Sequence, residues 1–283
     1  MLDQEIYEPN RNTAWCPGCG NFPLRKALAE ALAELEIHTD DFVMFSGIGQ
    51  AAKMPHYFKS NAFNGLHGRA LPPAIGFRMV NPAMKVIVES GDGDTYGEGG
   101  NHLLHNIRRN PDIAHFVHNN QIYGLTKGQA SPTTGTEIKT KVQPHGVTGE
   151  PFNPVRFAVG MRASFVARGF VSERDHLVML MKEALQHRGY ALVDILQPCV
   201  TFNKVNTYKW YAQNSYVLED DYDPTDYQSA VQKAEEWEEG IPLGIIYREE
   251  KPIFRDKFVN LSDKLLVDYP RPVEREEFMQ EFS

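Results

Sequence analysis

Two groups of side chains in this sequence are suited to chemistry, and the first is a set of three cysteines. Cys16 and Cys19 are separated by two residues in Trp-Cys-Pro-Gly-Cys-Gly, and Cys199 follows much later in Gln-Pro-Cys. Two thiolates at this spacing can reach one metal ion or one face of an iron–sulfur cluster. A four-cysteine zinc site would need a second cysteine pair, which this sequence lacks. A thioredoxin-like pair would need a strand directly before it. Three cysteines cannot form a closed disulfide framework, so their possible roles are metal binding, redox chemistry or packing.

The second group is Gly91-Asp92-Gly93-Asp94, between the apolar run Met84–Glu89 and a stretch compatible with a helix. Glycines let the backbone approach a phosphate, the start of a helix offers free N–H groups, and a carboxylate can hold Mg²⁺. Asn119 and Asn120 follow the next apolar run, and Asn120 stands 28 residues after Asp92. This pattern predicts a diphosphate and magnesium site, whereas an isolated motif of this kind would usually be a turn without a ligand.

The elements that must position these residues alternate between helix and strand. Apolar side chains recur at helical spacing over residues 21–35, and short apolar runs that end in polar loops indicate buried strands. This alternation predicts an α/β fold with a parallel sheet, whose strands would bring both groups to one edge. The other expected elements are strands Phe42–Phe45, Met84–Glu89, Ala114–Val117, Ser164–Ala167 and Ala191–Leu196, the last apolar strand, and helices Glu98–Arg109 and Asp175–Arg188, the second capped by Asp175.

Two stretches lack this alternation. Residues 124–154 are rich in glycine and proline and have almost no periodicity, which is typical of a long, ordered active-site loop. After about residue 205 the chain becomes acidic and aromatic, and only one modestly amphipathic helix is expected. We therefore divide the chain into a domain over residues 1–205 and an irregular C-terminal extension over residues 206–283, expected to pack on that domain or on a partner.

Composition narrows the function classes. The chain has 283 residues and a formal charge of −8, which argues against nucleic-acid binding because that task needs a basic surface. No apolar run approaches the roughly 18 residues of a membrane span, and the acidic N-terminus does not resemble a signal peptide. The sequence therefore predicts a cytoplasmic protein that binds neither nucleic acid nor membrane.

The Gly-Asp-Gly motif, followed nearly thirty residues later by two asparagines, resembles the thiamine diphosphate motif of thiamine-dependent enzymes. More of the chain matches one family among them. WCPGCGN, SGIG, KMPHYF, LHGRALPPAIG, ESGDGD, NNQIYGLTKGQASPT and QPC occur in the same order as in the β subunit of 2-oxoacid:ferredoxin oxidoreductases. The resemblance covers residues 12 to about 203. It implies a three-layer thiamine diphosphate-binding fold with Mg²⁺ held by Asp92, Asn120 and the carbonyl of Ile122.

The resemblance also implies a [4Fe–4S] cluster held by Cys16, Cys19 and Cys199, with a fourth cysteine directly after Gly-Ile-Gly. This chain has Gln50 there. The fourth ligand of the cluster could be an oxygen or nitrogen of Gln50, the nearby His56, or a water or hydroxide. A non-thiolate ligand would raise the reduction potential by lowering the negative charge of the site. Loss of the cluster is the competing interpretation.

Further residues around the cofactor follow from the same resemblance. Arg69 and His67 are donors suited to diphosphate oxygens, and Leu125 would be an apolar wedge beneath the cofactor. The alternative interpretation of Leu125 is ordinary packing within a loop. The residues expected to line the cofactor are Ile48, Gly49, Gln50, Ala51, His67, Gly68, Arg69, Ala70, Gly93, Asp94, Gly124 and Leu125.

Two lysines suggest which substrate is used. Lys53 and Lys127 are flexible cations that could bind the carboxylates of a 2-oxoacid. Related pyruvate enzymes usually carry glycine in place of Lys127, which favours 2-oxoglutarate; an exposed lysine without a function is the alternative. The family reaction would convert the 2-oxoacid and coenzyme A to acyl-CoA and CO₂, with electrons passing through the cluster to ferredoxin, and its reversal would fix CO₂.

The resemblance implies that this chain needs an α or fused γ–α partner, in an (αβ)₂ heterotetramer, and that a glutamate of that partner activates the cofactor. Three alternatives stay open. One is a β chain of a pyruvate:ferredoxin oxidoreductase. Another is a non-redox thiamine-dependent decarboxylase that has lost its cluster. The third, a cluster-bearing electron-transfer module without thiamine diphosphate, leaves the Asp92 motif unexplained. The four histidines His102, His105, His115 and His118 are interpreted as structural or as polar neighbours of the cofactor.

Overall fold

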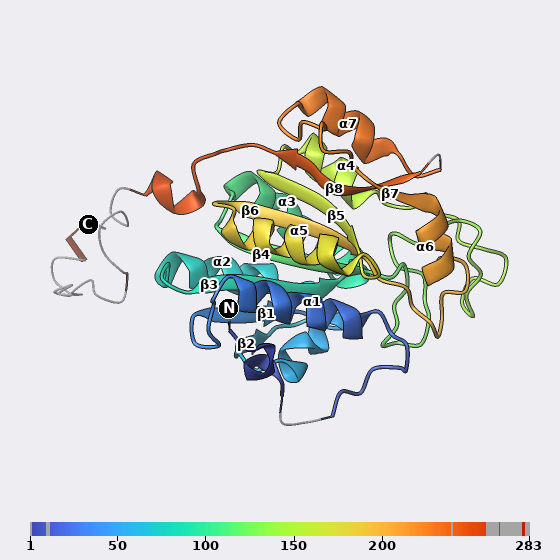
Figure 1. Cartoon of the computed structure of the whole chain (residues 1–283), viewed down its shortest axis with the longest axis horizontal. Coiled ribbons are helices and arrows are strands. Elements are labelled where there is room, and N and C mark those ends of the chain that lie inside the picture. The colour runs from blue at the N-terminus through green and yellow to red at the C-terminus, as the bar shows by residue number, and fades with distance from the viewer. Residues whose placement is uncertain (1, 10–11, 239, 259–265, 267–278, 281–283) are drawn as a thin grey trace.

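The computed structural model describes residues 2–9, 12–238, 240–258, 266 and 279–280. In this part of the chain, eight strands form one sheet in the order β2-β1-β3-β4-β6-β5-β8-β7 (Figure 1). The first six strands in sequence pair in parallel, β8 runs antiparallel to β5, and β7 is parallel to β8. Their bounds are β1 Phe42–Ser46, β2 Asn61–Asn64, β3 Lys85–Gly91, β4 Ile113–Asn119, β5 Phe165–Phe170, β6 Tyr190–Leu196, β7 Ser215–Val217 and β8 Ile241–Arg248.

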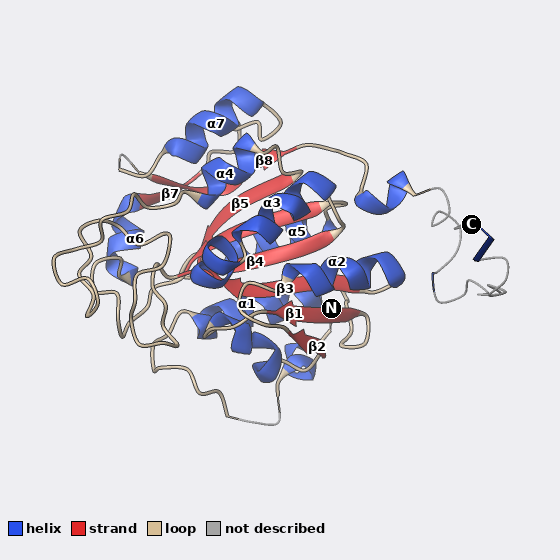
Figure 2. Cartoon of the chain, turned by 180° about the vertical axis from the view of Figure 1, so that it is seen from behind, coloured by secondary structure: helices blue, strands red, loops and turns tan. Residues whose placement is uncertain are grey.

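Helices cover both faces of the sheet, so the fold has three layers. Helices α1 and α5 pack on one face, and α2, α3, α4 and α7 pack on the other, which is turned toward the viewer in Figure 2. The helix bounds are α1 Asn21–Glu34, α2 Leu71–Val80, α3 Gly100–Arg109, α4 Pro154–Gly160, α5 Arg174–Gln186, α6 Tyr208–Asn214 and α7 Tyr227–Glu235, with 3₁₀-helices at Gln4–Tyr7, Ala51–Tyr57 and Phe254–Lys257 and a π-helical turn, η3, at Gly93–Glu98.

The central strands β1, β3, β4, β5 and β6 are buried because they have a hydrophobic core on each side. Along β1, Phe42 and Met44 face the α1/α5 layer, whereas Val43 and Phe45 face the α2/α3 layer. Successive side chains of a strand point to opposite faces, and a parallel sheet covered on both faces therefore needs continuous apolar runs. This requirement explains why short apolar runs in the sequence correctly indicated five of these strands.

Several expectations about the elements were wrong. Ala191–Leu196 is not the last apolar strand, because β8 is buried and joins the same sheet. Pro242 and Gly244 interrupt its apolar run, which is tolerated near the end of a sheet. The region after residue 205 also contains α6, β7 and α7 rather than a single helix. Apart from residues 266 and 279–280, the part of the extension beyond residue 258 lies outside the described residues.

Other differences are local. Asp175 does not cap its helix: α5 begins at Arg174, which places the Asp175 carboxylate in the first turn, still favourable to the helix dipole. The expected helix from Glu98 is divided between the π-helical turn and α3. Strand β2 has a polar sequence and α2 contains two prolines near its start, so neither showed a clear pattern. The long loop is confirmed, since residues 120–153 contain no helix or strand apart from a bridge between Tyr123 and Gln129.

No helix in the described ranges is both long and apolar enough to cross a lipid bilayer.

Candidate functional site: a diphosphate and metal cavity beside the cysteines

The loops that carry the candidate residues emerge at one edge of the sheet. Strands β1, β3, β4 and β6 are neighbours and parallel, so their carboxyl ends coincide. The register pairs Ser46 with Glu89 and Asn119 with Leu196, so the loops after these strands begin side by side. In parallel α/β sheets this edge is where ligands bind.

A cavity of about 60 Å³ lies at this edge. It is lined by most of the residues that the sequence singled out, although they come from loops far apart in the chain. Gly68, Arg69 and Ala70 are not among its lining residues. Those predicted residues that do line it are Ile48, Gly49, Gln50, Ala51, His67, Asp92, Gly93, Asp94, Asn120, Ile122, Gly124 and Leu125.

Asp92 is one of two buried carboxylates that line this cavity, and Asp94 is the other. Its Oδ2 accepts hydrogen bonds from Ser131 Oγ at 2.5 Å and Thr133 Oγ1 at 2.7 Å. Burial raises the pKa of Asp92 to about 6, although these two hydrogen bonds oppose the shift. The sequence reasoning did not identify Ser131 and Thr133, which lie in the long irregular loop.

A sharp turn brings Asn120 and Ile122 to the same cavity. Gln121, between them, has a left-handed backbone with φ of 58°, and Asn120 Oδ1 accepts a hydrogen bond from the Ile122 amide at 3.0 Å. Asparagine side chains commonly stabilise turns in this way. With Asp92, the cavity therefore gathers carboxylate, amide and backbone groups whose oxygens are of the kind that Mg²⁺ prefers.

Asp94 ties two loops together beside the cavity. Its Oδ1 accepts hydrogen bonds from the amides of Ile48 at 3.0 Å and Gly68 at 2.7 Å, and its buried Oδ2 has no hydrogen-bond partner in the described part of the chain. Burial raises the pKa of Asp94. Gly68 has φ of 69°, and a Cβ there would lie 2.4 Å from the backbone of Glu98. Only glycine fits this close approach.

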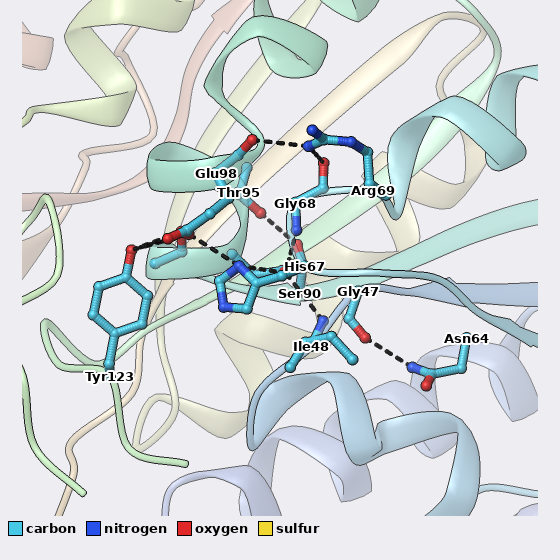
Figure 3. Close-up of polar contacts among 12 residues, drawn as sticks. Gly47, Ile48, Asn64, His67, Gly68, Arg69, Ser90, Thr95, Glu98 and Tyr123 are labelled. Carbon is cyan, nitrogen blue, oxygen red and sulfur yellow. Dashed lines mark hydrogen bonds and ion pairs between the residues drawn. The ribbon is translucent and has the colours of Figure 1, made fainter. Parts of the chain in front are cut away.

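His67 and Tyr123, which line the cavity, belong to a polar network with Glu98 (Figure 3). His67 Nδ1 lies 3.0 Å from Glu98 Oε2, and the Tyr123 hydroxyl donates to the same oxygen at 3.0 Å. Arg69 is engaged elsewhere, since its Nη1 donates to the carbonyls of Gly68 at 3.2 Å and Glu98 at 3.1 Å. The structure therefore shows Arg69 holding the loop that carries His67.

The three cysteines come together beside this cavity. Cys16 is exposed, whereas Cys19 and Cys199 are half-buried, and all three are free thiols. Burial raises the pKa of Cys19, and the nearby Cys199 and Cys16 raise it further. Cys16 and Cys199 therefore lie near Cys19. In the described residues, however, no set of three or more His, Cys, Asp or Glu side chains is arranged to hold a metal ion. The cysteine loop packs against the buried Gln197, since a Cβ at Gly20 would lie 2.7 Å from the Gln197 Cγ.

Gln50 joins the cysteine loop to the cavity. Its carbonyl accepts a hydrogen bond at 2.9 Å from the indole of Trp15, the residue directly before Cys16. The side-chain Oε1 of Gln50 is buried and has no hydrogen-bond partner among the described residues. Because a buried amide oxygen without a donor is costly, this atom is suited to an additional ligand.

The two lysines and Leu125 lie near the cavity in different settings. Lys53 is half-buried in the 3₁₀-helix that follows Gln50, and neither lysine lines the cavity itself. Lys127 is exposed on a tight turn closed by hydrogen bonds between Tyr123 and Gln129 and between Gly128 and Tyr123. Leu125 lies on the same turn and is 42% exposed.

The four histidines do not form a metal site. His115 and His118 are buried in β4 but belong to separate networks, and His102 and His105 lie on α3. His118 bridges Glu89 and Asn21, at 2.6 and 2.7 Å. These positions agree with their interpretation as structural or neighbouring residues.

Comparisons with known proteins identify this architecture. The family "Thiamine pyrophosphate enzyme, C-terminal TPP binding domain" matches residues 43–195. A second family, the C-terminal part of the pyruvate ferredoxin oxidoreductase β chain, matches residues 199–263. The first match confirms the predicted fold class and spans the loops that form the cavity.

Relatives match over nearly the whole chain. A 2-oxoacid:ferredoxin oxidoreductase subunit beta from Sulfolobus sp is 40% identical over 268 residues, covering 90% of this chain and 88% of the relative. The 2-oxoglutarate synthase subunit KorB from Methanocaldococcus jannaschii is 31% identical over 259 residues, covering 89% and 93%. A solved 2-oxoglutarate:ferredoxin oxidoreductase from Magnetococcus marinus, with 2-oxoglutarate, coenzyme A and succinyl-CoA bound, superposes with a TM-score of 0.92 at 31% identity, covering 100% of this chain and 96% of its own. This chain therefore belongs to the β subunits of the 2-oxoacid:ferredoxin oxidoreductases, enzymes with a thiamine diphosphate-binding domain.

Proposed function

We propose that this chain is the cofactor-binding subunit of an enzyme that converts 2-oxoglutarate and coenzyme A to succinyl-CoA and CO₂ and reduces ferredoxin, in a reversible reaction. The observation that carries the proposal is the cavity at the carboxyl edge of the sheet, which gathers Asp92, Asn120 and Ile122. The names of the relatives support the substrate, because several are 2-oxoglutarate enzymes.

The donor set fits a magnesium ion and the diphosphate of thiamine diphosphate. We assign Asp92, Asn120 and the Ile122 carbonyl as the metal ligands, and the metal would offset the cost of burying the Asp92 carboxylate. When bound, thiamine diphosphate supplies a carbanion that can add to the 2-oxo carbon of the substrate. Ser131 and Thr133 would orient Asp92 for this task.

The small size of the cavity supports the need for a partner. Pockets for organic ligands usually measure about 300–1,000 Å³, whereas this cavity measures about 60 Å³. Such a space suits the diphosphate and metal end of the cofactor but not the whole molecule. We therefore propose that an α subunit supplies the opposite wall and the activating glutamate, in an (αβ)₂ assembly.

We propose that the three cysteines hold an iron–sulfur cluster together with one ligand of another kind. Cys16 and Cys199 both raise the pKa of Cys19, so they lie near it, and Gln50 Oε1 is buried without a partner among the described residues. A cluster would accept the electrons of the oxidation one at a time and pass them to ferredoxin. Gln50, His56 or a solvent ligand remain the candidates for the fourth position.

The substrate-facing residues in this proposal are Lys53, Lys127 and Leu125. A dicarboxylate substrate carries two negative charges, so the two lysines would bind and orient it, and Leu125 would pack against the cofactor. If pyruvate were the substrate instead, Lys127 would have no second carboxylate to bind.

The proposal is tested on the complex co-purified anaerobically with its α subunit. We expect thiamine diphosphate in a denatured extract, iron in the protein, and dye reduction that depends on both 2-oxoglutarate and coenzyme A. Thiamine diphosphate without iron would indicate the non-redox decarboxylase. Iron without thiamine diphosphate would indicate an electron-transfer module, and a preference for pyruvate would refute the substrate assignment.

A further inference from the structure

A second and larger cavity lies between the long loop and the C-terminal part of the chain. Its volume is about 720 Å³, and pockets for organic ligands usually measure about 300–1,000 Å³. Residues of the loop between positions 133 and 153 form one side. Helices α6 and α7 and residues 236–238 form the other, and α6 lies beside the loop in both views (Figures 1 and 2). The proposed function assigns no ligand to this cavity.

The charged side chains around this cavity are mostly acidic. Among the described residues that line it, Arg156 is the one basic residue, and it lies 3.3 Å from Glu235. The glutamates that line it are Glu137, Glu150, Glu235, Glu236 and Glu238. Of these, Glu137, Glu150 and Glu238 are exposed and have no hydrogen-bond or ion-pair partner in the described part of the chain. Carboxylates without partners attract a cation and repel phosphorylated ligands such as coenzyme A.

Two tryptophans add ring faces to this acidic surface. Trp210 and Trp237 are half-buried and line the cavity, with their ring centroids 6.4 Å apart. Trp237 already contacts a cation, because the guanidinium carbon of the buried Arg168 lies 5.5 Å from its ring centroid. The charge of Arg168 is matched by Asp194, whose Oδ2 lies 3.9 Å from its Nε. Aromatic faces attract ammonium groups as well as guanidinium groups, so the tryptophans favour the same kind of ligand as the carboxylates.

Gln121 supplies a buried hydrogen-bond acceptor among the residues that line the cavity. It is 4% exposed, and its Oε1 has no hydrogen-bond partner within the described ranges. A buried amide oxygen without a donor is costly, so this atom is suited to accept an N–H from a ligand. The His, Cys, Asp and Glu side chains of the described residues form no group of three or more that could hold a metal ion. An ammonium group therefore fits this cavity better than a metal ion does.

We propose that this cavity is a binding site for an organic cation, a flexible molecule that carries ammonium groups. The unpaired glutamates attract its charge, the tryptophan faces cover its ammonium and methylene groups, and Gln121 Oε1 accepts one N–H. The inference does not depend on the proposed function, because it uses neither the cofactor cavity nor the cysteines.

Spermidine is the probe for this site, and the two tryptophans supply the signal. Of the three tryptophans in the chain, Trp15 does not line the cavity. Titration of the full chain with spermidine should give a saturable change in tryptophan fluorescence, whereas an uncharged diol of similar length should give none. The affinity should fall as the salt concentration rises, because salt screens exposed charges.

A double variant tests the carboxylates. Glu137→Gln combined with Glu150→Gln removes two unpaired charges at exposed positions and keeps the side-chain shape, so spermidine should bind about three- to tenfold more weakly. Glu5→Gln combined with Glu173→Gln, also exposed but outside the cavity, is the matched control and should bind as wild type does.

Calorimetry of the complex with its α subunit repeats the titration and should give the same affinity. No saturable binding to the full chain up to about 10 mM spermidine, or equal affinities for the two double variants, would overturn the inference. Binding that salt does not weaken would do the same. Binding to the chain that disappears in the complex would also overturn it and would indicate that the cavity belongs to the subunit interface.

Discussion

At the scale of single residues, Lys127 occupies a backbone conformation that favours glycine. Its φ of 77° lies in the left-handed region, which costs a lysine about 1 kcal/mol relative to glycine. The turn around it is nevertheless closed by three backbone hydrogen bonds, one of which the Lys127 amide donates to the Gly124 carbonyl. Strain of this kind is often found at functional sites, which agrees with the proposed contact between Lys127 and a substrate carboxylate.

Two substitutions of Lys127 distinguish the effect of its amine from the effect of the turn conformation. Both Lys127→Ala and Lys127→Gly should raise the KM for 2-oxoglutarate about tenfold or more, because each loses a charged hydrogen bond worth roughly 1.5–3 kcal/mol. The KM for pyruvate should change much less. Steady-state kinetics of the complex measures both values. If glycine restored the KM while alanine did not, turn shape rather than the amine would be responsible.

The sequence revealed individual site residues only where a motif marked them. Asp92 and Asn120 stand in recognisable patterns, and the structure places both on one cavity. Ser131 and Thr133 lie about forty residues after Asp92 in an aperiodic loop, and nothing in their local sequence indicates that they bond to its carboxylate. Their role depends on how the loop folds back, which short-range patterns do not encode.

At the scale of elements, a row of buried side chains connects three neighbouring strands. His115 on β4 contacts Ser90 Oγ on β3 at 2.7 Å and the Tyr190 hydroxyl on β6 at 2.6 Å. Burial lowers the pKa of His115 to about 3, so the ring is neutral in the folded protein. This row ties β3, β4 and β6 together within the sheet, and its Ser90 lies near the end of β3 that leads into the site.

This row predicts a loss of stability in acid. The unfolded chain binds a proton at His115 near pH 6.5, but the folded chain does so only near pH 3. The contribution of neutral His115 is therefore complete above pH 6.5 and declines by about 1.4 kcal/mol per pH unit as the pH falls toward 3. Urea denaturation between pH 7.5 and 5 should show a smaller pH dependence for His115→Gln than for wild type. His145→Gln, in an exposed loop, should retain the full dependence.

Elements were predictable where periodicity and burial agreed. The central parallel strands carry continuous apolar runs because both faces are covered, and α1 shows its helical stripe. Strand β8 was missed because Pro242 and Gly244 divide its apolar residues, and its antiparallel pairing with β5 is a long-range property. Tertiary contacts rather than local propensity determine that strand.

At the scale of the whole molecule, the cofactor site is a single wall. The cavity is much smaller than thiamine diphosphate requires, and its lining residues come from one edge of one sheet. In the proposed function, the fold would position the metal end of the cofactor and leave the other end to a partner. The sequence indicated this division only through the family resemblance, because no local pattern in one chain indicates that a second chain is needed.

The isolated chain should therefore bind thiamine diphosphate and Mg²⁺ weakly. We expect its dissociation constant to exceed that of the complex about a hundredfold or more, equivalent to roughly 2.7 kcal/mol, because the contacts proposed for the partner are missing. Equilibrium dialysis of both preparations measures this ratio. Equal affinities would show that this chain holds the cofactor alone.

The close contact between Gly20 and Gln197 also has an evolutionary consequence. A Cβ at position 20 would overlap the glutamine side chain, so a side chain can enter there only after position 197 becomes smaller. The two positions, 177 residues apart in the sequence, should therefore covary among related chains. A lineage that shortens the residue before Pro-Cys would gain conformational freedom in its Cys-Pro-Gly-Cys loop.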